Sequence, residues 1–201
     1  YAMLRSLVGS DMCIRDRSRL GLKTDGSADG VTVLRQGWGV EPLTEGQAAC
    51  VSTMSYNEYW VVRDAGYSPE QLTVFKYQSE GAATLEDGLY VHEKNLSDAA
   101  FKDKMVRFVR ASMKGWKYAE ANPKEAAMII LDNDDAGVQT EKHQVRMMGE
   151  IAKLTAGSNG SLDPADYERT VKVLMSGDSD PVITKKPSGA WTNEITNAAL
   201  N

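Results

Sequence analysis

The chain has 201 residues, of which 42% are hydrophobic and 25% charged, a composition typical of globular proteins. Its formal net charge is −5 and it has no long basic run, which argues against nucleic acid and anionic membrane surfaces as partners. No apolar run approaches the ~18 residues that a membrane-spanning helix needs, so we expect no direct membrane insertion.

The first twenty residues do not fit the pattern of the rest. Residues 7–17 read LVGSDMCIRDR and resemble the translation of a sequencing-library adapter, with Asp11 where the adapter frame gives Glu. We therefore predict that residues 1–20 are an artefactual or disordered segment with little regular contact. The alternative is a genuine basic tail. A signal peptide is not indicated, because the segment lacks an apolar core and a small-residue cleavage site.

Residues 21–81 are predicted to form a small α/β lobe that begins with a glycine-rich loop at 21–30. Alternating and β-branched apolar runs indicate strands, and the S-x-x-E pattern at Ser55–Glu58 has the form of a capping box that starts a helix. The predicted strands are 31–34, 48–54 and 72–75, and the predicted helices are 40–46 and 56–65, the second followed by Gly66.

Ligands of open α/β sheets bind beyond the carboxyl ends of the strands. Aromatic and amide side chains follow the first two predicted strands, and they offer flat apolar faces and hydrogen-bonding groups. Backbone N–H groups at the start of the second helix suit an anionic or carbonyl group. The candidate ligand-binding residues are Trp38, Tyr56, Asn57, Glu58 and Glu80. The alternative is structural, with Glu58 only capping its helix.

Residues 82–201 are predicted to begin with a hinge near 80–86 and a strand at 88–92, and then to be mostly helical. Start signals for helices occur at Ser97, Asn122–Pro123, Glu141 and Asp163–Pro164, and a last short helix follows Trp191.

Motifs for catalysis or metal binding are not found. His92 and His143 have no Ser or Cys partner at a suggestive spacing, so no catalytic residue is predicted. There is no C-x-x-C, H-E-x-x-H or P-loop pattern, and the acidic turn at 132–135 lacks the EF-hand spacing. We therefore predict no metal site and no cofactor.

Four stretches carry a resemblance to a known family: RQGWGVEPLTEGQAACVSTMSYNEYW, TLEDGLYVHEKNL, FVRASMKGWKYAEANPKEAA and GAWTNEITNAAL. They resemble solute-binding proteins of ABC importers for nitrate, sulfonates, taurine or the pyrimidine precursor of thiamine. The resemblance implies an α/β, periplasmic binding protein-like (type II) fold of two lobes. Residues 21–81 would then be lobe 2, residues 82–201 would return to lobe 1, and the N-terminal part of lobe 1 would be missing. Apolar faces that the missing part would cover, those of Leu89, Val91, Phe108 and Trp116, would be exposed.

The resemblance also implies a function. It implies capture of a small polar or heteroaromatic solute, delivery to an importer permease, and a periplasmic parent protein whose signal peptide is absent here. An acidic group such as Glu58 in the cleft favours an amine- or pyrimidine-bearing solute over nitrate. The alternative is an enzyme of thiamine pyrimidine precursor biosynthesis on the same fold. That enzyme uses a histidine and iron, and neither histidine lies in the predicted cleft.

Overall fold

The structure is a computed structural model that describes residues 6–8, 32–34, 36–176 and 181–200. The predicted loop at 21–30 and most of residues 1–20 lie outside these ranges. The chain forms two compact units: unit 1 comprises Tyr1–Leu85 and Ala165–Pro187, and unit 2 comprises Glu86–Pro164 and Ser188–Asn201. The sequence-based division instead keeps residues 165–187 with the second part. Among the described residues, no helix is long and apolar enough to cross a membrane.

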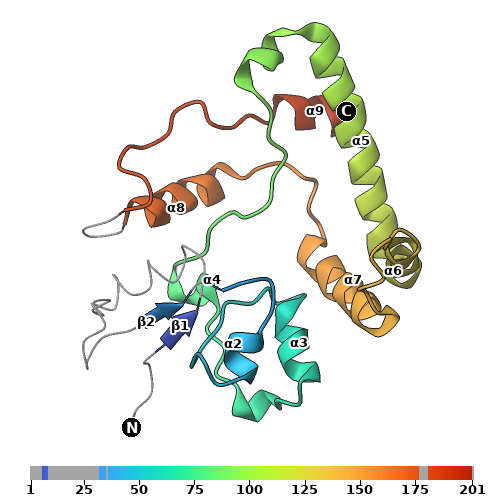
Figure 1. Cartoon of the computed structure of the whole chain (residues 1–201). Helices are drawn as coiled ribbons and strands as arrows, with labels where there is room; N and C mark the ends of the chain where they lie inside the picture. The colour runs from blue at the N-terminus through green and yellow to red at the C-terminus, as the bar shows by residue number, and fades with distance from the viewer. Residues whose placement is uncertain (1–5, 9–31, 35, 177–180, 201) are drawn as a thin grey trace. The chain divides into compact units, whose positions relative to one another are not determined.

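Unit 1 contains short elements, and most of them lie in its N-terminal segment (Figure 1). They are β1 Ser6–Val8, β2 Thr32–Leu34, α2 Glu41–Thr44, α3 Glu58–Asp64, the 3-10 turn η1 Pro69–Gln71, α4 Tyr77–Glu80 and α8 Pro164–Met175. β1 pairs in parallel with β2, with Ser6 opposite Thr32 and Val8 opposite Leu34. This pairing differs from the expectation that residues 1–20 make little regular contact. Apolar and β-branched residues in both segments suit such a pair.

The first predicted strand is confirmed as β2, whereas three other predicted strands are wrong. Residues 51–54, 72–75 and 88–92 have no regular secondary structure, and the segment 48–54 contributes only an isolated bridge at Cys50. A run of strand-forming residues becomes a strand only when a neighbouring backbone completes the hydrogen-bond ladder. At 72–75 the side chains of Val74 and Phe75 are exposed, so they lack the packing that stabilises a strand.

The two helices predicted in this segment are present but shorter. Helix α3 begins at Glu58 rather than Tyr56, and its N-cap is Asn57 rather than Ser55. The carboxylate of Glu58 turns back and accepts the N–H of Met54 at 2.8 Å. The predicted back-bonding by Glu58 is therefore real, but it reaches the residue before Ser55. Gly66 follows the C-cap with a φ of 104°, as predicted for a glycine that ends a helix.

Unit 2 is helical in its described part, as the start signals predict (Figure 1). Its elements are the 3-10 turn η2 Glu93–Ser97, α5 Ala99–Ala121, α6 Pro123–Asp132, α7 Glu141–Thr155 and α9 Glu194–Leu200. The N-cap of α5 is Asp98 rather than the predicted Ser97, because the Asp98 carboxylate accepts the Ala100 N–H at 2.9 Å. The Ser97 hydroxyl donates instead to the Lys94 carbonyl.

The core of unit 2 lies where α6 packs on α7. Ala126 and Ala127 of α6 and Met148 of α7 are buried together, with Ala119 and Val145 packed against them. The small alanine side chains let the two helices approach closely, and the flexible Met148 side chain fills the remaining space. The helix α9 lies along α5, where Lys102 and Glu194 form an ion pair at 2.6 Å.

Candidate functional site

All five predicted ligand-binding residues belong to unit 1 and lie on three short segments. Trp38 is in the turn between β2 and α2, and its side chain is fully exposed. Tyr56 and Asn57 precede α3, Glu58 is the first residue of α3, and all three are half-buried. Glu80 is the last residue of α4 and is exposed. Each residue therefore lies at the end of an element or in a turn, where binding residues are common.

The side-chain amide of Gln36 joins the first two of these segments. Its Oε1 accepts the N–H of Ser52 at 3.0 Å, and its Nε2 donates to the Ser52 carbonyl at 2.9 Å. The amide thus bonds both backbone groups of Ser52, as a neighbouring strand would. At Ser52 a side chain therefore takes the place of the neighbouring strand that the sequence-based prediction of a strand at 48–54 requires. The same Nε2 also donates to the Gly39 carbonyl at 3.2 Å, which closes the turn that carries Trp38.

The third segment is joined to the second through Ser52 and Tyr77. Their hydroxyl oxygens lie 3.5 Å apart, at the long end of the hydrogen-bond range. Tyr77 is the first residue of α4, and Gly81 ends this helix with a left-handed φ of 69°. A hydrogen-bonded chain therefore runs from the Trp38 turn through Gln36 and Ser52 to the helix that ends at Glu80.

The segment after α4 is fixed on the body of unit 1. Ala82 and Ala83 are buried, and the guanidinium of Arg169 in α8 donates to the Ala83 carbonyl at 3.3 Å. The hydroxyl of Thr170 accepts the Leu85 N–H at 2.8 Å. Helix α8 thereby holds the chain on the C-terminal side of Glu80, so α4 is anchored at both of its ends.

Asn57 and Glu58 interact with each other and with the preceding backbone. The Asn57 side-chain amide donates to one carboxylate oxygen of Glu58 at 3.0 Å, and the other oxygen accepts the Met54 N–H. Glu58 therefore holds the turn at Met54 that precedes α3, whereas the predicted capping box would bond the Ser55 N–H. Two donors stabilise its carboxylate in this arrangement.

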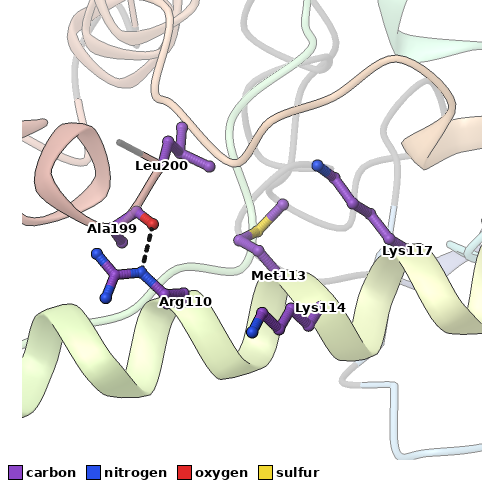
Figure 2. A pocket seen from close by; sticks show the side chains of 6 residues that line it. All are labelled: Arg110, Met113, Lys114, Lys117, Ala199 and Leu200. Atoms are coloured by element: carbon purple, nitrogen blue, oxygen red, sulfur yellow. Dashed lines mark hydrogen bonds between the residues drawn. The ribbon is translucent and has the colours of Figure 1, made fainter.

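Two hollows occur elsewhere, in unit 2, and none of the five candidate residues lines them. One has a volume of about 250 Å³ between α5 and α9 (Figure 2). Figure 2 shows Arg110 turned toward Ala199, while Lys114 and Lys117 lie further along α5. The other, of about 500 Å³, lies at the start of α6 around Pro123 and Met128. Among the described residues, no group of three or more His, Cys, Asp or Glu side chains is placed to hold a metal ion.

The residues that connect the site were not among the sequence-based candidates. Gln36 lies two positions after the predicted strand at 31–34, and Tyr77 lies two positions after the predicted strand at 72–75. The pairing of Gln36 with Ser52 spans sixteen positions, so no local spacing predicts it. The one available signal is a long amide side chain directly after a strand, beside two glycines that let the backbone turn.

Comparison with known proteins identifies the family. The family described as NMT1/THI5-like matches residues 19–126, which is more than half of the chain and includes all five candidate residues. The chain therefore belongs to the NMT1/THI5-like family, which has the periplasmic binding protein fold. The predicted resemblance is confirmed, because this is the family of nitrate, sulfonate, taurine and thiamine precursor binding proteins of ABC importers. No curated protein and no solved structure matches the chain significantly.

The family also sets the general role of the chain. Its members are mostly non-enzymatic solute-binding proteins, and the match supports a solute-binding role in ABC transport. The family is typically periplasmic. These statements concern the family as a whole.

Proposed function

We propose that this chain is the substrate-binding component of an ABC importer and that it captures a small polar or heteroaromatic solute between two lobes of an α/β, type II fold. The carrying observation is the family match over residues 19–126. The candidate solutes are a sulfonate, taurine, nitrate and the thiamine pyrimidine precursor. The protein would bind its solute in the periplasm and deliver it to the permease of the importer.

We propose that Trp38, Tyr56, Asn57, Glu58 and Glu80 bind the solute. The chemistry of their side chains and their short-range contacts support this proposal. The exposed indole of Trp38 offers a flat apolar face, and the amide of Asn57 offers donors and an acceptor beside the Glu58 carboxylate. Such a set suits a planar ring that carries an amino group. The thiamine pyrimidine precursor is therefore our first candidate and nitrate our last.

The enzyme of thiamine pyrimidine precursor biosynthesis is the alternative within the same family. It needs a histidine near the bound substrate. None of the five residues proposed to bind the solute is a histidine. This set therefore suits binding better than that chemistry. If the chain is a binding protein, chromatography should recover the bound solute chemically unchanged after prolonged incubation.

Calorimetric titration tests the binding role. The chain is titrated with taurine, nitrate and the thiamine pyrimidine precursor, and the same titrations are repeated with the double variant Tyr56→Ala/Asn57→Ala. Loss of one stacking face and one hydrogen-bonding amide should weaken binding at least about tenfold, since each contributes on the order of 1 kcal/mol. The control is Tyr90→Ala/Asn133→Ala, which removes an exposed tyrosine and an exposed asparagine from unit 2. Absence of binding for all three solutes, or equal affinity in both double variants, contradicts the proposal.

A further inference from the structure

We infer that Gln36 is a positioning residue of the solute site: its amide sets the position of the Trp38 turn relative to the segment that leads to Tyr56 and Asn57. The inference rests on the proposed function and adds a residue that does not itself touch the solute. It follows from three hydrogen bonds made by one half-buried side chain, two to Ser52 and one to Gly39.

The geometry makes Gln36 difficult to replace. Its Nε2 donates to two carbonyl oxygens and its Oε1 accepts one N–H, so donors and acceptor are all engaged. A glutamate has the same shape but only acceptors when ionised. Its carboxylate would keep the Ser52 N–H and would face the carbonyl oxygens of Ser52 and Gly39 without a donor. Repulsion between these oxygens should push the two segments apart.

The consequence should extend to all three segments that carry the candidate residues. The bond from Gln36 to the Gly39 carbonyl closes the turn that holds Trp38. Ser52, the other partner of Gln36, lies four residues before Tyr56. The Ser52 hydroxyl contacts Tyr77 of α4, the helix that ends at Glu80. The Trp38 side chain makes no buried contact of its own, because it is fully exposed. Its position therefore depends on the backbone turn that Gln36 closes.

The test compares Gln36→Glu with Gln47→Glu. Both variants change one glutamine of unit 1 to glutamate, and so change the net charge equally. Gln47 is exposed and its side chain bonds only to the neighbouring Glu45 carboxylate among the described contacts. Two quantities are measured on the full chain. One is the 19F chemical shift of Trp38 after 5-fluorotryptophan labelling, assigned with Trp38→Phe. The other is the Kd for the solute, among the thiamine pyrimidine precursor, taurine and nitrate, that the unmodified chain binds most tightly.

We expect Gln36→Glu to shift the Trp38 resonance and to weaken binding about tenfold, and Gln47→Glu to change neither. Circular dichroism shows whether Gln36→Glu is unfolded. If it is, Gln36→Asn, whose amide is one methylene shorter, replaces it, and we expect a smaller shift of the Trp38 resonance and a smaller loss of affinity. An unchanged Trp38 resonance and an unchanged Kd in Gln36→Glu overturn the inference. Absence of binding of all three titrated solutes by the unmodified chain overturns the proposed function instead. An unshifted Trp38 resonance with weakened binding assigns Gln36 to the solute contact itself and also overturns the positioning role.

Discussion

Arg110 of α5 donates from Nε to the carbonyl oxygen of Ala199 in α9 at 2.9 Å (Figure 2). Its Nη2 donates to the carbonyl of Ala198 at 3.0 Å. The last carbonyls of a helix have no partner within the helix, and they lie at the negative end of its dipole. One guanidinium therefore satisfies two carbonyls of α9 and places a positive charge where the dipole favours it. This contact fixes the C-terminal helix on the longest helix of unit 2.

Replacing Arg110 by leucine should weaken the attachment of α9. We expect a loss of about 1–2 kcal/mol in the free energy of unfolding, since hydrogen bonds to charged groups are stronger than neutral ones but this site is partly exposed. Hydrogen exchange of the α9 amides should accelerate. The control is Arg107→Leu, which removes only an exposed pair with Asp103 at 3.0 Å and should cost about 0.3–0.5 kcal/mol. Equal losses in both variants would show that Arg110 does not hold α9.

Met148→Ala should be among the most damaging single changes in unit 2. Met148 is buried against Ala126 and Ala127, and the backbone of two regular helices cannot collapse into the space that the methionine leaves. We expect a loss of about 2–4 kcal/mol in the free energy of unfolding, measured by urea denaturation. Met128→Ala is the matched control, because Met128 is exposed on α6 and should lose well under half as much. A comparable loss at Met128 would contradict the packing described for α6 and α7.

The helices were predictable from the sequence because their signals are local. Pro123 stands at the first position of α6, and Gly66 follows the end of α3, as residue type and spacing indicate. The sequence wrongly predicted strands at 48–54, 72–75 and 88–92, because a local pattern does not say which group, if any, will pair with the backbone. At Ser52 that group is the Gln36 side chain. The same holds for the candidate site. Its residues lie at element ends that local signals predict, but the Gln36 amide bonds Ser52 sixteen positions away, and no local signal predicts that contact.

The phenol of Tyr118 should titrate above the ordinary value for tyrosine, which is about 10. Its hydrogen bond to the Glu125 carboxylate, followed by desolvation and by the charge of Glu125, raises the pKa of Tyr118. A group whose pKa is raised by folding contributes stability below its unfolded pKa, and that contribution is lost as the pH rises through its folded pKa. Glu125→Ala should therefore lower the pKa of Tyr118, as followed by the 13Cζ resonance in an NMR titration. Glu120→Ala provides the control at a nearby carboxylate, and an unchanged Tyr118 pKa in Glu125→Ala would contradict the assignment.

Phe108 and Trp116 should promote self-association of the chain. Their exposure was predicted from the sequence and is confirmed, at 54% for Phe108 and 45% for Trp116, with Leu89 and Val91 also exposed. Phe108 and Trp116 lie eight positions apart on α5, within about a quarter turn of each other, so both aromatic side chains stand on one side of the helix about 12 Å apart. Apolar surface of this kind favours association in water.

Phe108→Gln/Trp116→Gln should reduce the associated fraction in sedimentation velocity experiments. The same change should alter the free energy of unfolding by less than about 0.5 kcal/mol, because exposed side chains contribute little to folding. The control is Lys104→Gln/Lys117→Gln, which changes two exposed polar positions on the same helix. Association that persists unchanged in the first variant would place the contact surface elsewhere.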